Sequence, residues 1–266
     1  MSLRKAIYIV SMLSCSILLL AGCSAAASEP PGTATAQSER IQKLATQMAG
    51  AAQAADTAAK QQATETAAAA AALLNRAAAW PVVISDTFDT DHNQWTTGLK
   101  SGDLSTETLT IEGGKYNWTA TAKDGFVYWT TPFTETVKNF YLAVDAQQIS
   151  GPEGGDMALV FHEADYSNFY LFEVSSLKMF SITQLVKDEW QKRIDWTASD
   201  VIKAFEPNHL EVIGEDGSFY FYINGSQVGN YIESSATEGS SGIAVALYNK
   251  DDTGEFTFDN FVLRVP

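Results

Sequence analysis

The sequence predicts an all-β fold, a two-sheet antiparallel sandwich, over residues 80–266. Short apolar or alternating segments recur about every 8–12 residues in this region, and no long helical period interrupts them. Residues 208–229 show the pattern most clearly, because they contain three strand-like segments separated by two turns. The second turn is Asn224-Gly225, a favoured dipeptide of two-residue hairpins, since both positions tolerate positive φ.

The middle strand of this segment has a period of two residues. Phe219, Phe221 and Ile223 lie on one predicted face, and Tyr220 and Tyr222 lie on the other. A meander that is apolar on one face must bury that face against another layer. We therefore expect the remaining strands to supply a second sheet.

Residues 1–22 have the features of a secretory signal peptide. Arg4 and Lys5 precede an apolar run over residues 6–20, which is too short to favour a permanent membrane-spanning helix. The run ends in Leu-Ala-Gly-Cys at 20–23, which resembles the lipobox of bacterial lipoproteins. That resemblance implies acylation of Cys23, for example with palmitate, and an extracytoplasmic chain anchored to the cell membrane or the outer membrane. The alternative is an ordinary signal peptide with an incidental cysteine.

Between the signal and the sandwich, the composition predicts two further segments. Residues 23–37 are small, polar and interrupted by proline, which is typical of a flexible tether. Residues 38–79 are rich in alanine and are broken only by Gly50, so we expect a helical stalk. Ile41, Leu44 and Met48 begin a heptad-like stripe, and the stalk is therefore either a lone spacer helix or an alanine-seamed coiled coil.

The strands of the sandwich are expected in regular succession, with a polar loop at 89–98 and a further loop and strand edge at 187–196. Residues 198–205 are expected to hold a helical turn. Outside the meander, the predicted strands are Val82–Phe88, Leu109–Ile111, Lys115–Ala122, Gly125–Trp129, Phe140–Ile149, Met157–His162, Asn168–Val174, Met179–Leu185, Gly242–Tyr248 and Glu255–Val265.

The net charge of the chain is −15, and the acidic excess lies in the predicted sandwich. Arg4 and Lys5 are basic, and the charges of residues 24–80 cancel. A domain this acidic is repelled by nucleic acid and by anionic lipid headgroups, so we expect no nucleic-acid partner. The charge either serves solubility alone or attracts cations.

Several short motifs across residues 82–266 resemble the concanavalin A-like lectin/glucanase superfamily. The closest pattern is that of laminin-G-like and keto-disaccharide-hydrolase-like modules of bacterial surface proteins. The resemblance implies a two-sheet jelly roll with a concave face that often binds glycans. The motifs are F-x(6)-W at 88–95, A-L-V-F-H at 158–162, N-F-Y-L-F at 168–172, W-x(5)-W at 190–196, Y-I-N-G at 222–225, G-I-A-V at 242–245 and F-D-N-F at 258–261.

Strand alternation indicates where a ligand would bind. If Phe161 faces the core, His162 faces outward, and the same alternation places Leu171 and Glu173 on the outer face of the next strand. Aromatic rings and a few polar groups at a concave surface are the usual elements of a sugar site. The candidate ligand-binding residues are His162, Glu173, Trp190, Arg193 and Trp196. The alternative for both tryptophans is burial in the core.

A structural Ca²⁺ ion is a further candidate, where the first and last strands are expected to meet. Asp259-Asn260 interrupts the alternation of the last strand, which indicates a β-bulge. Asp86 and Asp89 lie at the first strand, and with Asp259 they offer the carboxylate oxygens that Ca²⁺ prefers. The alternative is that Asp259 and Asn260 only satisfy backbone groups at the bulge.

Three functions remain open: a glycan-binding module, a structural or protein-interaction domain at the surface, and a glycoside-active enzyme. The glucanase members of the superfamily carry E-x-D-x-x-E on one strand. This chain has no such run, and its three histidines lack metal-ligand spacing. The sequence therefore predicts no catalytic residues.

Overall fold

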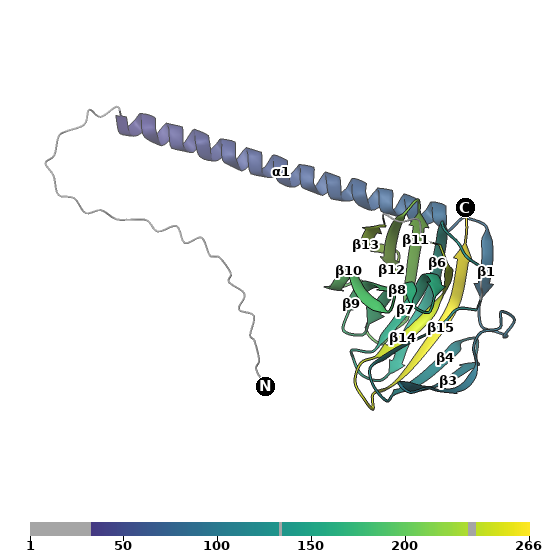
Figure 1. Ribbon diagram of the computed structural model, residues 1–266. Coiled ribbons are helices and arrows are strands. Elements are labelled where there is room, and N and C mark those ends of the chain that lie inside the picture. Colours follow the sequence, from purple (N-terminus) through teal and green to yellow (C-terminus); the bar gives the residue numbers. More distant parts are fainter. Residues whose placement is uncertain (1–32, 133–134, 234–237) are drawn as a thin grey trace. The chain divides into compact units, whose positions relative to one another are not determined.

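The computed structural model describes residues 33–132, 135–233 and 238–266. It contains the helix α1 (Thr33–Ala77), followed by strands β1 to β15. The strands form two antiparallel sheets that pack face to face (Figure 1). The predicted all-β sandwich is confirmed. Cys23 and the predicted signal peptide lie outside the described residues.

The larger sheet has nine strands, and its two longest strands, β6 and β15, lie side by side at its centre. Strand β1 (Val82–Asp86) pairs with β15 beside the main path of the sheet. Along that path the order is β13 (Ser226–Ile232), β12 (Ser218–Ile223), β11 (Asn208–Glu215), β6 (Phe140–Ser150), β15 (Thr253–Arg264), β4 (Tyr116–Ala122), β3 (Ser105–Ile111) and β2 (Gly98–Ser101).

The smaller sheet has six strands and forms the other layer of the sandwich. Neighbouring strands are antiparallel throughout. Their order is β10 (Glu189–Ala198), β9 (Met179–Val186), β8 (Asn168–Ser175), β7 (Asp156–Asp165), β14 (Ser240–Leu247) and β5 (Phe126–Thr130).

The core lies between the two sheets, and the meander behaves as its alternation predicts. Phe219, Phe221 and Ile223 of β12 are buried in the main core, while Tyr222 packs on the outer side of the nine-stranded sheet. The hairpin at Asn224-Gly225 has positive φ at both residues, 52° and 76°. This sign at both central positions is the one that the Asn-Gly dipeptide favours.

The last turns of α1 pack on the outer side of the nine-stranded sheet. The chain divides into two structural units at residue 59, and residues 60–77 of α1 belong to the same unit as the sandwich. Leu73 and Leu74 pack against a buried cluster that includes Tyr222, whose hydroxyl donates to the Ala70 carbonyl at 3.0 Å. The predicted stalk therefore ends as part of the domain.

Some predicted boundaries differ from the observed ones. Helix α1 begins at Thr33, so residues 33–37 of the predicted tether are helical, because the last helix breakers are Pro30, Pro31 and Gly32. Strand β2 lies partly inside a region predicted to be a loop, and β10 is a full strand. Of residues 198–205, Ala198 ends β10 and residues 199–205 form turns and irregular backbone without a helix. These short edge segments have weak hydrophobic sequence patterns, and their conformation depends on pairing with a neighbouring strand.

Candidate glycan-binding face

The outer face of the six-stranded sheet is the side that points away from the core. The strand register places one side chain from each of five neighbouring strands opposite the next, in a row across this face. The row consists of Trp129, Ala244, Ala158, Glu173 and Ser181. Small alanines in the middle of the row leave room for the large tryptophan and for groups on adjacent strands.

Aromatic rings extend over the same face from β5 to β10. The ring of Phe169 lies 4.5 Å from that of Trp129 and 5.7 Å, edge to face, from that of Trp190. Tyr166 packs beside Trp129 with ring centroids 5.9 Å apart. Trp190 is 51% exposed and Tyr166 is 80% exposed. We call Trp129, Tyr166, Phe169 and Trp190 the aromatic group.

A carboxylate holds part of the aromatic group in place. The indole N–H of Trp129 donates to Glu163 Oε1 at 2.8 Å. The hydroxyl of Ser240 donates to the other oxygen, Glu163 Oε2, at 3.0 Å. Because these two donors come from different strands, Glu163 fixes the Trp129 ring against the sheet.

Two buried carboxyl groups lie on the same face as the aromatic group, Glu173 in the row with Trp129 and Asp156 at the end of the β7–β8 pair opposite Phe169. Asp156 pairs with Ser175 and Ala158 pairs with Glu173, so Asp156 and Glu173 are diagonal neighbours on adjacent strands. Burial raises the pKa of both carboxyls, and the charge of Glu173 raises that of Asp156 further. Each therefore holds its proton to higher pH than a solvated carboxyl does.

The two carboxyls differ in how they are satisfied. The hydroxyls of Ser181 and Thr183 donate to Glu173 Oε2 at 2.7 and 2.9 Å. The hydroxyl of Tyr248 donates to Asp156 Oδ2, whereas Asp156 Oδ1 is buried with no hydrogen-bond partner among the described residues. An unpartnered buried oxygen costs stability unless a ligand or water donates to it.

Asp156 also lines a pocket at the end of the sheet. The pocket has a volume of about 400 Å³, which falls in the range of small-ligand sites. Its walls are mainly apolar or aromatic, and Asp156 is the carboxyl group among them. The other lining residues are Gly154, Ser175, Leu177, Met179, Trp196 and Tyr248.

Three of the five predicted ligand-binding residues lie at this surface. Glu173 faces outward from β8, as the alternation predicts. Trp190 is exposed on β10, and Trp196 is half-buried at the wall of the pocket. Neither tryptophan belongs to the main core. Their role in binding stays a prediction.

His162 does not face outward, and this part of the prediction is wrong. The pairing of β7 with β8 is irregular after Phe161, and His162 has a φ of +49°. The ring turns inward, packs against Phe140 and Phe219, and makes a hydrogen bond of 3.1 Å to the Lys138 carbonyl. Burial lowers the pKa of His162 to about 4, so the ring is neutral at pH 7.

Arg193 is also turned away from the predicted site. Lys192 pairs with Thr183 on the outer side of β9, so the two-residue alternation points Arg193 to the opposite, inner side. The Arg193 guanidinium donates to Gln184 Oε1 at 2.8 Å and lies over the ring of Tyr231, 5.5 Å from its centroid. It therefore connects the six-stranded sheet to β13 of the other sheet.

The structure does not bring Asp86, Asp89 and Asp259 together as a metal site. Within the described ranges, no group of three or more His, Cys, Asp or Glu side chains is placed to hold a metal ion. Asp86 instead accepts hydrogen bonds of 2.8 Å from the Phe88 amide, the Asn93 side chain and the Trp95 indole.

The bulge predicted in the last strand is confirmed. The pairing of β15 with β6 shifts between Asp259 and Val262, and Asn260 has a φ of +52°. The Asn260 amide donates to Asp259 Oδ1 at 2.7 Å, and its side chain donates to Asp145 at 2.8 Å. These contacts match the alternative in which the two residues satisfy groups at the bulge.

Sequence reasoning missed Asp156, Trp129, Glu163 and Phe169. Asp156 and Trp129 lay at or just outside the ends of predicted strands, where assignment is least certain. Glu163 lay in a predicted turn. Phe169 had a usable signal, because it alternates with the core residues Tyr170 and Phe172 in the pattern that also places Glu173 outside.

Comparisons with known proteins support the fold. No family model and no curated protein matches the chain. The GlcNAcα1-4Gal-releasing endo-β-galactosidase of Clostridium perfringens is structurally similar, with a TM-score of 0.51 and 14% identity over 69% of this chain and 61% of that chain. The two proteins share the sandwich fold. At this identity, the similarity extends no further than the fold.

Other solved structures match more weakly. A carbohydrate-binding module from Bacillus subtilis gives a TM-score of 0.45 at 20% identity, covering 63% of this chain and 96% of that chain. A laminarinase catalytic domain from Thermotoga maritima gives 0.49 at 11% identity, covering 70% and 98%. Separately, no helical segment within the described ranges is both long and apolar enough to cross a bilayer.

Proposed function

We propose that the outer face of the six-stranded sheet binds glycan, and that lipid on Cys23 anchors the chain to a membrane. The observation that carries the binding proposal is that the aromatic group and two buried carboxyls, Glu173 and Asp156, share one face of the sheet. Sugars present C–H patches that pack on aromatic rings and hydroxyls that donate to carboxylates. This face offers both kinds of group from strands held in one register.

Two features support this surface over the rest of the sandwich. Trp190 keeps half of its surface exposed although it packs edge to face with Phe169, so part of its ring is available to a ligand. Asp156 Oδ1 lacks a donor among the described residues, and a sugar hydroxyl in the adjoining pocket would supply one. Neither feature is needed to hold the sheets together.

The test is binding of the purified full-length chain to a glycan array, followed by titration of each glycan that binds. We expect Trp190→Ala to weaken binding about tenfold, because one aromatic stacking contact contributes about 1.5 kcal/mol. We expect Asp156→Asn to alter which glycans bind, because the amide replaces an acceptor with a donor.

Phe205→Ala is the matched control, since Phe205 is an exposed aromatic residue between β10 and β11 and does not belong to this face. Its affinity should equal that of the wild type. The proposal fails if the wild type binds no glycan, or if Trp190→Ala and Asp156→Asn both bind as the wild type does.

A further inference from the structure

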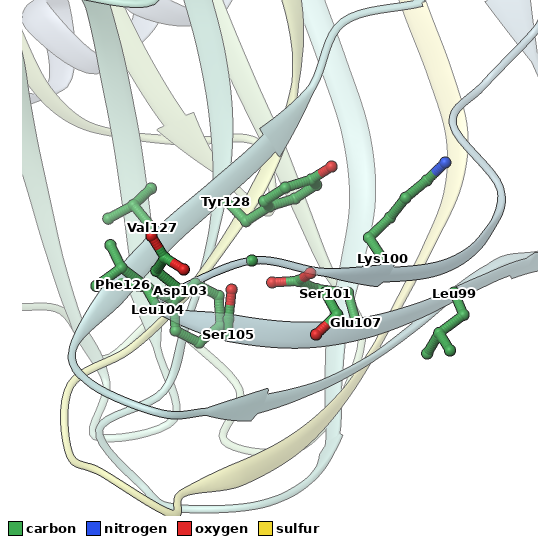
Figure 2. Close-up of a pocket in the computed structure, with 11 residues that line it drawn as sticks. Leu99, Lys100, Ser101, Asp103, Leu104, Ser105, Glu107, Phe126, Val127 and Tyr128 are labelled. Carbon is green, nitrogen blue, oxygen red and sulfur yellow. The ribbon is translucent and has the colours of Figure 1, made fainter.

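The two lateral edges of the sandwich differ. At the edge between β10 and β13, Arg193 covers Tyr231, and Ile194 packs into the core beside Gly229. The opposite edge, where β2 and β3 face β5, holds a cleft of about 640 Å³ (Figure 2). We call this the edge cleft. It is lined by different residues from the pocket beside Asp156.

The walls of the edge cleft are mixed in character. Leu104 and Leu99 are exposed at 51% and 70% and come from the β2–β3 turn and β2, while Phe126 and Tyr128 come from β5. Figure 2 shows these side chains around Glu107, which projects from β3. A volume of this size suits a ligand of one or two sugar residues.

Glu107 is the unusual residue of the cleft. Its side chain is 1% exposed, and Oε1 has no hydrogen-bond partner among the described residues. Burial raises the pKa of the Glu107 carboxyl. A buried polar atom of this kind requires an explanation, because an apolar residue at the same position would remove its desolvation cost.

The charges around Glu107 restrict the ligand. Lys123 interacts electrostatically with Glu107 and donates hydrogen bonds to Ser101 Oγ at 2.9 Å and to the Gly102 carbonyl at 2.7 Å. Because one cation already compensates the carboxylate, the missing partner is a hydrogen-bond donor without charge. An anion would be repelled by Glu107 and by Asp103 at the same cleft.

A second unsatisfied group lies behind the Tyr128 ring. Trp118 packs edge to face on Tyr128, with centroids 5.7 Å apart, and its buried indole N–H has no acceptor among the described residues. Leu109 pairs with Trp118, and Glu107 pairs with Ala120, so Trp118 and Glu107 are diagonal neighbours on adjacent strands. Polar groups without partners therefore gather on this side of the core.

We infer that the edge cleft is a second binding site, which takes a single uncharged sugar residue. One ligand hydroxyl donates to Glu107 Oε1, and the C–H face of the ring packs on Tyr128. Leu99 and Leu104 close over the apolar side of the ligand. The residue comes either from a free monosaccharide or from the end of a glycan chain, since both present the same hydroxyls.

The experiment is saturation-transfer NMR on the full-length chain. The titrated sugars are an aldohexose, a ketohexose and an N-acetylhexosamine, each as the monosaccharide and as a trisaccharide built from it. Glu107→Leu removes the acceptor at similar volume, and Leu104→Trp fills the mouth of the cleft. We expect at least one sugar to bind the wild type. Its affinity should fall about tenfold or more in both variants, because a hydrogen bond to a charged group is lost or blocked.

Trp190→Ala is the control that separates the two sites, because it alters the outer face of the six-stranded sheet and leaves the edge cleft intact. Binding at the cleft should be unchanged in it. Binding of trisaccharides alone identifies a chain end as the ligand, and binding of monosaccharides identifies the free sugar as sufficient.

A thermal melt without ligand supplies a second readout. Glu107→Leu should melt at the same temperature as the wild type or higher, because it removes an unpartnered buried oxygen. The inference is overturned if no sugar binds the wild type, if binding survives in both cleft variants, or if only Trp190→Ala abolishes it. Should Glu107→Leu fail to fold, Leu104→Trp decides alone, since its side chain is half exposed.

Discussion

Single residues decide which side chains the outer face of the six-stranded sheet presents. The irregularity after Phe161 turns His162 into the core and brings Glu163 to the Trp129 indole. The shift between Lys192 and Ile194 likewise turns Ile194 toward the core. One extra residue in a strand moves every later side chain to the opposite face of the sheet, because successive side chains alternate between the two faces.

Asp156 makes the stability of the sandwich depend on pH. Its folded-state pKa lies well above the unfolded value of about 3.9, so folding favours the protonated form. This contribution is largest at low pH and is lost as pH rises from about 4 through the folded-state pKa. Asp156→Asn lacks the ionisation, so its stability relative to the wild type should rise between pH 4 and pH 8.

Urea denaturation at the two pH values measures this difference. Asp103→Asn is the control, because Asp103 is an exposed carboxylate in the β2–β3 turn. Its stability relative to the wild type should change little over the same range. Equal pH profiles for Asp156→Asn and the wild type would show that this carboxyl is solvated in solution.

At the scale of elements, the approach of neighbouring backbones determines where glycine is required. In β14, a Cβ atom on Gly242 would lie 2.1 Å from the Thr130 carbonyl oxygen of β5. Because the clash is with backbone, a side-chain rotation cannot relieve it. Gly242→Ala should therefore lower the free energy of unfolding by about 3 kcal/mol, the upper part of the range for overpacking.

Gly102→Ala provides the comparison for this substitution. A Cβ on Gly102 meets nothing within 4 Å, and its φ is outside the left-handed region. Its free energy of unfolding should stay within about 0.5 kcal/mol of the wild type, as for most surface changes. Chemical denaturation measures both variants, and similar midpoints for the two would contradict so close an approach of β14 to β5.

At the scale of the whole molecule, the proposed lipid on Cys23 would determine where the sandwich operates. The basic residues, the apolar run and the Leu-Ala-Gly-Cys sequence predict lipid on Cys23. Metabolic labelling with a clickable fatty acid should mark the wild type and Cys15→Ser equally, and should not mark Cys23→Ser. Labelling of Cys23→Ser at the wild-type level would exclude this anchor.

The sequence by itself determined the fold class, the meander and the outward position of Glu173. These features rest on local signals: a two-residue period, and turn residues such as Asn224-Gly225 whose backbone preferences do not depend on distant contacts. Leu73 and Leu74 are large apolar residues near the end of the alanine-rich stalk, a sequence signal for a buried contact. In the structure they pack on the sandwich. Most strands were therefore predictable, and their ends were less so.

Only the tertiary structure decided which polar groups share a site. Asp156 and Glu173 lie 17 positions apart in the sequence and become neighbours through the register of β7 with β8. Glu107 and Tyr128 come from different sheets and meet because β2, β3 and β5 end at the same edge of the sandwich. Register and sheet packing depend on the sum of many distant contacts, and a single irregular residue such as His162 changes them. For this physical reason the sequence indicated a candidate face, and the structure decided which residues lie on it.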